Sequence, residues 1–190
     1  VSVPISDKFG IRVSGLLRRQ DGWVRNDLTG DDNPETRSVA GRIVAAWRPS
    51  DSFDATLLYQ TFETKTNGNA VEFVADVLGN ARARALAAGN PGFEANLDRH
   101  NSSTNGAFGE TDRTHGNRVV GTMNYDTGGV TLTSVSSYSD FDQRVVSDKD
   151  FNTGQYLNQT TTLANEQYSQ ELRLTSPSNR AFSYILGLYY

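Results

Sequence analysis

The alternation of apolar and polar residues is the feature that most constrains this chain. Between Phe9 and Arg18, apolar side chains occupy the odd positions and polar ones most of the even positions. Because successive side chains of a strand point to opposite faces, such a stretch has one apolar and one polar face. The pattern recurs within residues 38–47, 53–60, 118–125, 130–141, 167–174 and 182–188, although in 130–141 it holds only as far as Ser134. The sequence therefore predicts an all-β chain with seven strands, each roughly ten residues long.

The connections between these strands alternate strictly between short and long. Pro, Gly, Asn, Asp and Ser mark tight turns at residues 48–52, 126–129 and 176–180, and a fourth at 4–8 makes residues 1–3 the end of an earlier strand. The long connections are residues 21–36, 64–116 and 144–164. Outer-membrane barrels have short periplasmic turns and long extracellular loops, whereas a sandwich has no reason to sort its loops by length. We therefore expect a segment of an antiparallel, up-and-down transmembrane β-barrel.

Aromatic residues on the apolar parity support this interpretation. Five of them adjoin a short turn, as a girdle at one membrane interface would require: Phe9, Trp47, Phe53, Tyr125 and Phe182. Tyr59, Tyr168 and Tyr190 share the parity farther from those turns, where a second girdle would lie. The opposite parity carries charged residues predicted to face the barrel lumen: Arg12, Arg18, Arg42, Arg118, Glu171 and Arg173. Pairing among these charges is favoured over attraction of an anionic ligand, because unpaired buried charge is costly.

Composition excludes several other classes of protein. The chain has no cysteine, which removes disulfide scaffolds, thiol catalysis and thiolate metal sites. A net charge of -4 with mixed signs argues against nucleic acid as a partner. His100 and His115 lie in a polar connection that fixes no ligand spacing, and no nucleophile elbow or phosphate-binding loop occurs. We therefore predict no enzyme activity, metal or cofactor. A hydrophobic share of 36% suits a soluble protein, yet a barrel wall also needs only one apolar face.

The connection 64–116 is long enough to carry structure of its own. Ala70–Ala88 is predicted to be an amphipathic helix that ends at Gly89–Gly92. Its apolar stripe comprises Val71, Val74, Leu78 and Leu86. Residues 101–116 are rich in Asn, Ser, Thr and Gly, and are predicted to be a mobile loop.

Several motifs resemble the barrel of TonB-dependent outer-membrane receptors. Residues 19–26 (RQDGWVRN) resemble the family's first extracellular hairpin, and Gly41-Arg42 with residues 47–51 (WRPSD) resembles its next strand and turn. Residues 132–138 (LTSVSSY) and 187–190 (GLYY) are similar to later strands. The most specific stretch is 167–176 (QYSQELRLTS). Only 64–116 lacks a counterpart.

The resemblance implies an outer-membrane transporter that takes up a scarce nutrient, such as a ferric siderophore, with energy supplied through TonB. Such barrels have about 22 strands around a plug domain, so residues 1–190 would be an internal part of the barrel domain, with the plug absent. Implied partners are the plug, the TonB complex, outer-membrane lipid and the small-molecule ligand. Candidate ligand contacts in the predicted extracellular loop 64–116 are Phe93, Phe108 and Glu110.

Two alternatives remain open from the sequence. The chain could be a small complete barrel, porin-like or adhesin-like, with Tyr190 as its terminal aromatic residue. It could also be a soluble all-β binding domain in which Leu57, Met123 and Leu172 pack in a core between two sheets. The exposure of these three side chains separates the membrane and sandwich hypotheses.

Overall fold

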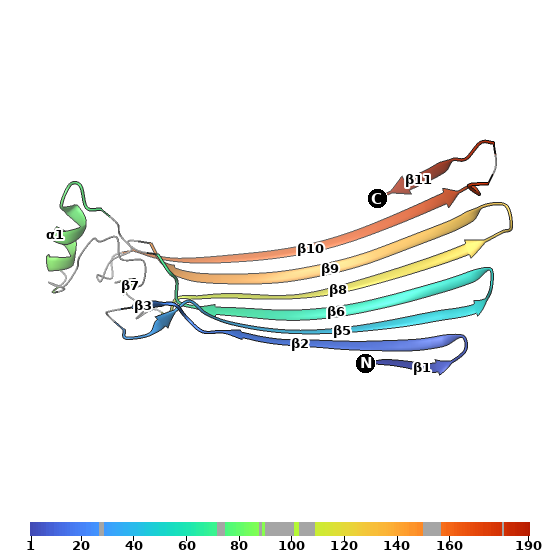
Figure 1. Ribbon diagram of the computed structural model, residues 1–190. Coiled ribbons are helices and arrows are strands. Elements are labelled where there is room, and N and C mark those ends of the chain that lie inside the picture. The colour runs from blue at the N-terminus through green and yellow to red at the C-terminus, as the bar shows by residue number, and fades with distance from the viewer. Residues whose placement is uncertain are drawn as a thin grey trace.

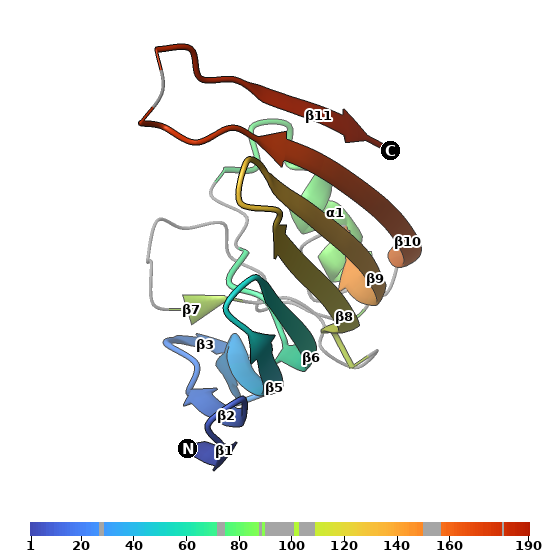
Figure 2. The same cartoon turned by 90° about the vertical axis from the view of Figure 1, so that its right-hand side faces the viewer.

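The fold is one long, curved antiparallel sheet. The computed structural model describes residues 1–26, 29–71, 75–87, 89, 101–102, 109–149, 157–179 and 181–190. Eight strands pair in the order β1-β2-β5-β6-β8-β9-β10-β11 (Figure 1). Their bounds are β1 Ser2–Ser6, β2 Phe9–Gln20, β5 Glu35–Ser50, β6 Phe53–Asn67, β8 Thr111–Asp126, β9 Thr131–Asp148, β10 Asn158–Thr175 and β11 Ile185–Tyr189. Viewed end-on, the strands follow an arc from β1 to β11 (Figure 2). The predicted all-β antiparallel architecture is confirmed.

The short turns and long connections lie at opposite ends of the sheet. Every short turn lies at one end, and the long connections, with α1 (Asn80–Ala87), β3 (Val24–Asn26) and β7 (Asn101–Ser102), lie at the other (Figure 1). At the turn 126–129, Gly128 has φ 82° and donates its N–H to Asp126 Oδ1 at 2.8 Å. A side chain is strained at such a φ, which explains the glycine.

The strands are longer than the predicted ten residues. β9 and β10 each have 18 residues, and β5 and β8 each have 16. The alternation of apolar and polar residues reports contact with an apolar medium, whereas strand length is set by the backbone hydrogen-bond ladder. The ladder continues beyond the alternating stretches into polar segments such as Thr111–Gly116, which was predicted to be loop and forms the start of β8.

The predicted boundaries at the short-turn end were also partly wrong. Pro4 is paired with Gly10 inside β1, so the first turn is shorter than residues 4–8. Proline is tolerated there because β1 is an edge strand, where a missing N–H costs no ladder bond. At the other edge, Phe182 precedes β11 and is not part of a strand.

The helix is shorter than the predicted Ala70–Ala88. It spans Asn80–Ala87, and its start is fixed by Gly79, with φ 66°, and by Asp76, whose Oδ2 accepts the Arg82 N–H at 2.8 Å. The left-handed backbone at Gly79 breaks the helical path. The predicted apolar stripe therefore does not form. Val71 and Leu78 lie outside the helix, and Val74 lies outside the described residues.

A small second sheet lies at the end of the large sheet where the long connections are. Its order is β4-β3-β7, with β4 at Asp32–Asn33, and β3 and β7 run parallel. Val24 on β3 is 3% exposed and Ala81 on α1 is 8% exposed, and they are the buried apolar side chains of the described residues. The large sheet therefore has no packed apolar core within the described part of the chain.

Candidate functional site: the two faces of the sheet

The strand register sorts the side chains into one apolar and one polar face. Cross-strand partners share a face of a sheet. On the apolar face, Trp47 lies between Phe9 and Ala55, and Leu57 lies between Ala45 and Gly121. The apolar positions assigned from sequence on six strands therefore form one continuous surface.

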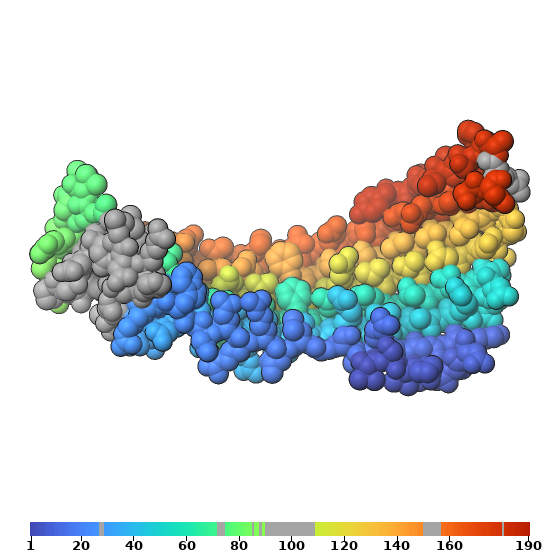
Figure 3. All heavy atoms as spheres, viewed as in Figure 1, coloured from blue at the N-terminus to red at the C-terminus, as the bar shows by residue number. Residues whose placement is uncertain are grey.

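Nothing among the described residues covers this apolar face. Leu57 is 54% exposed, Met123 47% and Leu172 50%. Figure 3 shows the long sheet as a thin curved wall rather than as two packed layers. A sandwich would bury these three side chains between its sheets, so the sandwich interpretation was wrong for the described chain. Exposed apolar patches of this extent mark an interaction surface, for another protein or for a membrane.

Aromatic residues border the apolar face on both sides. Near the short turns, the rings of Trp47 and Phe53 meet edge to face, with centroids 5.7 Å apart and an interplanar angle of 77°. On the other side, Tyr138 and Tyr168 are cross-strand partners with centroids 4.7 Å apart. Sequence reasoning missed Tyr138 because the alternation in 130–141 is lost after Ser134. Its register position opposite Tyr168 is the signal that recovers it.

Both borders of the apolar face are stepped, and in the same direction. Phe9 and Trp47 are partners, but Phe53 on the next strand lies two residues closer to the short turns. On the other border, apolar residues extend to Leu17 and Val39 on β2 and β5, whereas on β6 they end at Tyr59. Strands that tilt across a membrane cross its level boundaries with such a stagger. The step is confined to the junction of β5 and β6, because from β6 to β10 the lower border stays at the register of Phe53 and the upper border at that of Tyr59.

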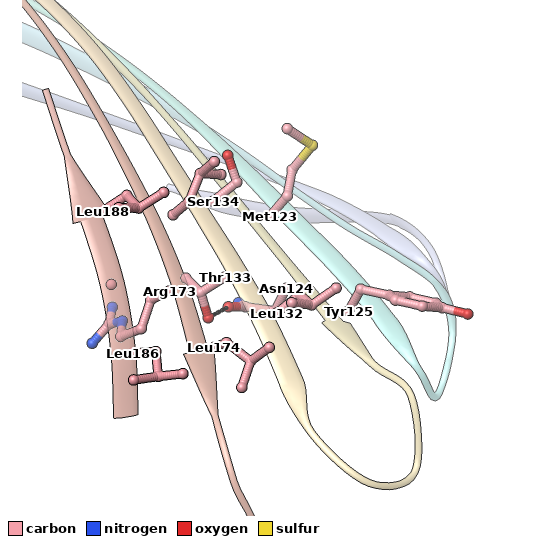
Figure 4. A pocket seen from close by; sticks show the side chains of 12 residues that line it. Met123, Asn124, Tyr125, Leu132, Thr133, Ser134, Arg173, Leu174, Leu186 and Leu188 are labelled. Carbon is pink, nitrogen blue, oxygen red and sulfur yellow. Dashed lines mark hydrogen bonds between the residues drawn. The ribbon is translucent and has the colours of Figure 1, made fainter. Parts of the chain in front are cut away.

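The apolar face contains a hollow near β11. It has a volume of about 740 Å³ and lies between β8, β9, β10 and β11 (Figure 4). Its apolar lining includes Met123, Leu132, Leu172, Leu186 and Leu188. The hollow belongs to the exposed apolar surface. Asn124, Thr133, Ser134 and Arg173 also belong to its lining, and Thr133 Oγ1 donates a hydrogen bond to Asn124 Oδ1 at 2.8 Å.

All six charged residues predicted to face the lumen lie on the polar face. The register places each of them on the parity opposite to Trp47 and Leu57, and they are Arg12, Arg18, Arg42, Arg118, Glu171 and Arg173. Most of them bond locally. Arg42 donates to Gln60 Oε1 from Nε at 3.0 Å and from Nη2 at 2.6 Å, and Arg173 Nε lies 3.3 Å from Glu171 Oε1.

Two further arginines of this face also form local hydrogen bonds. Arg12 Nε donates to Ser2 Oγ at 2.9 Å, and Arg18 Nη2 donates to Gln20 Oε1 at 3.0 Å. Arg118 lies across from Gln60 on β6. The polar face is thus lined with partly occupied hydrogen-bond donors, as a surface that meets water or another polar protein surface requires.

The loop candidates are placed only in part. Phe93 and Phe108 lie outside the described residues. Glu110 is 5% exposed, and its Oε1 accepts hydrogen bonds from Asn69 Nδ2 and from the Asp148 N–H, the latter at 3.1 Å. Its carboxylate thereby links the connection 64–116, through Asn69, to the connection 144–164, through Asp148. Among the described residues, no three His, Asp or Glu side chains are grouped to hold a metal ion.

The sequence and the structure of this chain were compared with those of known proteins. Neither a family model nor a curated protein matches the sequence. The structure is, however, similar to a solved one, that of the ferric yersiniabactin uptake receptor FyuA from Yersinia pestis. The TM-score is 0.73 over 99% of this chain, at 20% sequence identity. The fold of this chain is therefore similar to that of part of the FyuA barrel. This chain spans 27% of the receptor's length, and the arc of its sheet is open at β1 and β11.

The similarity is one of fold. A fold of this kind explains why the sheet has one apolar and one polar face. A segment of barrel wall has one face directed outward and one inward, with alternate residues on each. Within the described residues, no helix combines the length and the apolar character needed to cross a membrane.

Proposed function

We propose that this chain forms part of the wall of an outer-membrane transporter that takes up a scarce nutrient, such as a ferric siderophore, with energy supplied through TonB. The observation that carries the proposal is the exposed apolar band bordered by aromatic residues. Outer-membrane barrels have such a band, about 25 Å tall, between two aromatic girdles. The fold similarity to an uptake receptor supports the same function.

In this proposal the two faces have separate tasks. The apolar face contacts lipid, and Phe9, Trp47, Phe53, Tyr125 and Phe182 lie at the periplasmic interface. The polar face lines the lumen, where its arginines contact the plug domain of the complete protein. Arg42 and Arg118 lie on either side of Gln60, so they would offer donors to carboxylates of a plug or to an anionic substrate.

The long connections form the extracellular side, and the ligand is bound there. Residues 64–116 carry Phe93 and Phe108 as candidate aromatic contacts. Glu110 stabilises the start of these connections, because its carboxylate is buried and accepts hydrogen bonds from Asn69 and Asp148. The buried Glu110 therefore positions the loops in this proposal.

Uptake measurements on the protein expressed from its complete reading frame test the proposal. Cells that carry it should accumulate radiolabelled iron from a ferric siderophore under iron limitation. A strain without TonB should bind the siderophore but not accumulate the iron. Accumulation that is independent of TonB would contradict the proposal and would indicate a passive pore. Absence of the protein from the outer membrane would contradict it as well.

A further inference from the structure

Most of the buried polar residues in the described part of the chain lie in or beside the long connections. Asn26 is 0% exposed, Asp148 1% and Glu110 5%, whereas the other buried polar residue, Ser176, lies at a short turn. A buried polar group is costly unless hydrogen bonds replace its contacts with water. The hydrogen bonds at this end therefore decide how the connections are held where they leave the large sheet. We call these places the roots of the connections.

Glu110 joins two roots through one carboxylate oxygen. Its Oε1 accepts hydrogen bonds from Asn69 Nδ2, just after β6, and from the Asp148 N–H at the end of β9, the latter at 3.1 Å. The ladder between β8 and β9 ends at Thr111 and Val146, two residues before Asp148. The Glu110 side chain therefore supplies an acceptor to Asp148 at a point that this ladder does not reach.

The backbone of Glu110 is held as well. Its C=O accepts the Gly68 N–H at 2.8 Å, which continues the pairing of β6 with β8 beyond Asn67 and Thr111. Both ends of the segment that joins β6 to β8 are thereby fixed to each other at the root. The carboxylate of Glu110 then extends this fixed point to β9.

The connection 21–36 meets the connection 64–116 at two places. β3 runs parallel to β7, with Arg25 opposite Asn101. Nearer the large sheet, Gly68 lies against Asn33, because a Cβ on Gly68 would come within 2.2 Å of Asn33 Oδ1. Gly68 has φ 71°, a conformation that glycine adopts without strain. The three long connections are therefore joined in the order 21–36, 64–116, 144–164.

We define the root cluster as the five residues that make these contacts: Asn33, Gly68, Asn69, Glu110 and Asp148. Glu110 is central to it, because it bonds directly to Gly68, Asn69 and Asp148. Groups that share one hydrogen-bond network are disrupted together rather than one at a time.

We propose that Glu110 couples the roots of the three long connections, so that they become ordered, or lose order, as one unit. A carboxylate suits this task because charge-assisted hydrogen bonds are about twice as strong as neutral ones. Its loss would also leave the buried Asp148 N–H without this acceptor, which is costly. Glu110 acts here as a positioning residue.

The coupling has a consequence for the proposed transporter, in which the long connections form the extracellular side. A ligand that contacts one connection would also order the other two, without touching them. This consequence rests on the proposed function, whereas the coupling itself rests on the contacts of the root cluster.

Hydrogen–deuterium exchange tests the coupling on the protein expressed from its complete reading frame, in phosphatidylcholine nanodiscs. Mass spectrometry follows the peptides that contain Asp148, whose N–H loses its acceptor when Glu110 is changed, and two reporter amides whose acceptors stay intact. The reporters are Trp23, which donates to Asn33 O at 3.0 Å, and Lys149, which donates to Leu157 O at 2.9 Å. Faster exchange at the reporters therefore measures coupling rather than the loss of a local bond.

Glu110→Gln keeps the shape of the side chain and removes its charge. It should speed exchange about tenfold at Asp148 and, through the coupling, at both reporters. Asp112→Asn is the matched control, because the Asp112 carboxylate accepts two hydrogen bonds from Gln143 Nε2, at 3.0 and 3.1 Å, within the β8–β9 pair. It should change exchange at the same amides by less than about twofold.

Two outcomes would overturn the proposal. One is faster exchange confined to Asp148 in both Glu110→Gln and Glu110→Ala, the second of which removes the acceptor altogether. The other is an equal response of the reporters to Asp112→Asn, which would show a general loss of stability instead. Reporters that respond to Glu110→Gln in a protein without TonB-dependent iron uptake would leave the coupling standing and overturn the proposed function. Uptake without any response of the reporters would overturn the coupling alone.

Discussion

Replacing Leu57 by arginine tests the assignment of the apolar face to lipid. Leu57 lies four residues from Phe53 along β6, which places it about 9 Å above the lower aromatic border at a rise of about 3.3 Å per residue and a tilt of about 45°. It therefore lies inside the apolar band, between Phe53 and Tyr59, which border the band on the same strand and face. Its side chain is 54% exposed, so no protein group among the described residues is placed to shelter a charge.

The expected cost follows from that depth. An arginine on the lipid face near the midplane destabilises an outer-membrane barrel by about 2–4 kcal/mol, which lowers the ratio of folded to unfolded protein by roughly 30- to 1,000-fold. The assay is urea unfolding of the full-length protein in phosphatidylcholine vesicles, followed by tryptophan fluorescence. The midpoint should move to lower urea with an unchanged slope.

The neighbouring residue provides the control. Leu58 lies on the polar face, opposite Val44 and Val120. In Leu58→Arg the new charge enters the lumen, where water or a polar plug surface can solvate it. We expect its destabilisation to be at least about 1 kcal/mol smaller than that of Leu57→Arg. Equal losses in the two variants, or a larger loss in Leu58→Arg, would refute the assignment of the faces.

Three further predictions follow from particular contacts. Gly116→Ala should lower the free energy of unfolding by about 1–3 kcal/mol in the same urea assay, because a Cβ there would meet Phe62 at 2.8 Å; Gly121→Ala, which would meet nothing within 4 Å, should be nearly neutral. Arg42→Leu should cost about 1 kcal/mol or less, because Arg42 bonds to a neutral amide rather than to a charge; a loss as large as that of a lipid-facing arginine would contradict this. Glu63→Gln should lower the free energy of unfolding by about 1 kcal/mol or less, because it breaks an exposed ion pair with Arg113; a loss above about 2 kcal/mol would contradict this.

The sequence predicted the fold well where one physical cause controls the pattern. Alternation arises wherever a strand has apolar surroundings on one face and polar surroundings on the other, and the short turns need Gly, Pro and Asp at defined positions. Leu57 and Arg42 were therefore assigned to opposite faces, as the register places them. Strand ends were predicted poorly, because Thr111–Gly116 is polar on both faces and only its hydrogen-bond ladder makes it a strand.

The helix was mispredicted for a related reason. Apolar residues in 70–88 suggested a stripe, but Gly79 in the left-handed region and the carboxylate of Asp76 fix a later start. Local backbone geometry overrode the pattern. Glu110 was proposed as a ligand contact because it is an acid in a long loop, and that role stays a prediction. Its burial results from contacts with Asn69 and Asp148, which lie far from it in sequence.

A row of five basic residues, paired across five neighbouring strands, shows most clearly what a sequence conceals. Its members are residues 19, 37, 65, 113 and 144, and their spacings are irregular because the intervening connections differ in length. No periodicity can reveal such a set, since the alignment arises only when the register is fixed strand by strand. The same register places Lys65, Arg113 and Arg144 at one distance, six residues, beyond the aromatic border formed by Tyr59, Val119 and Tyr138. Local chemistry and long-range pairing together therefore produce a set that neither the composition nor the periodicity of the sequence displays.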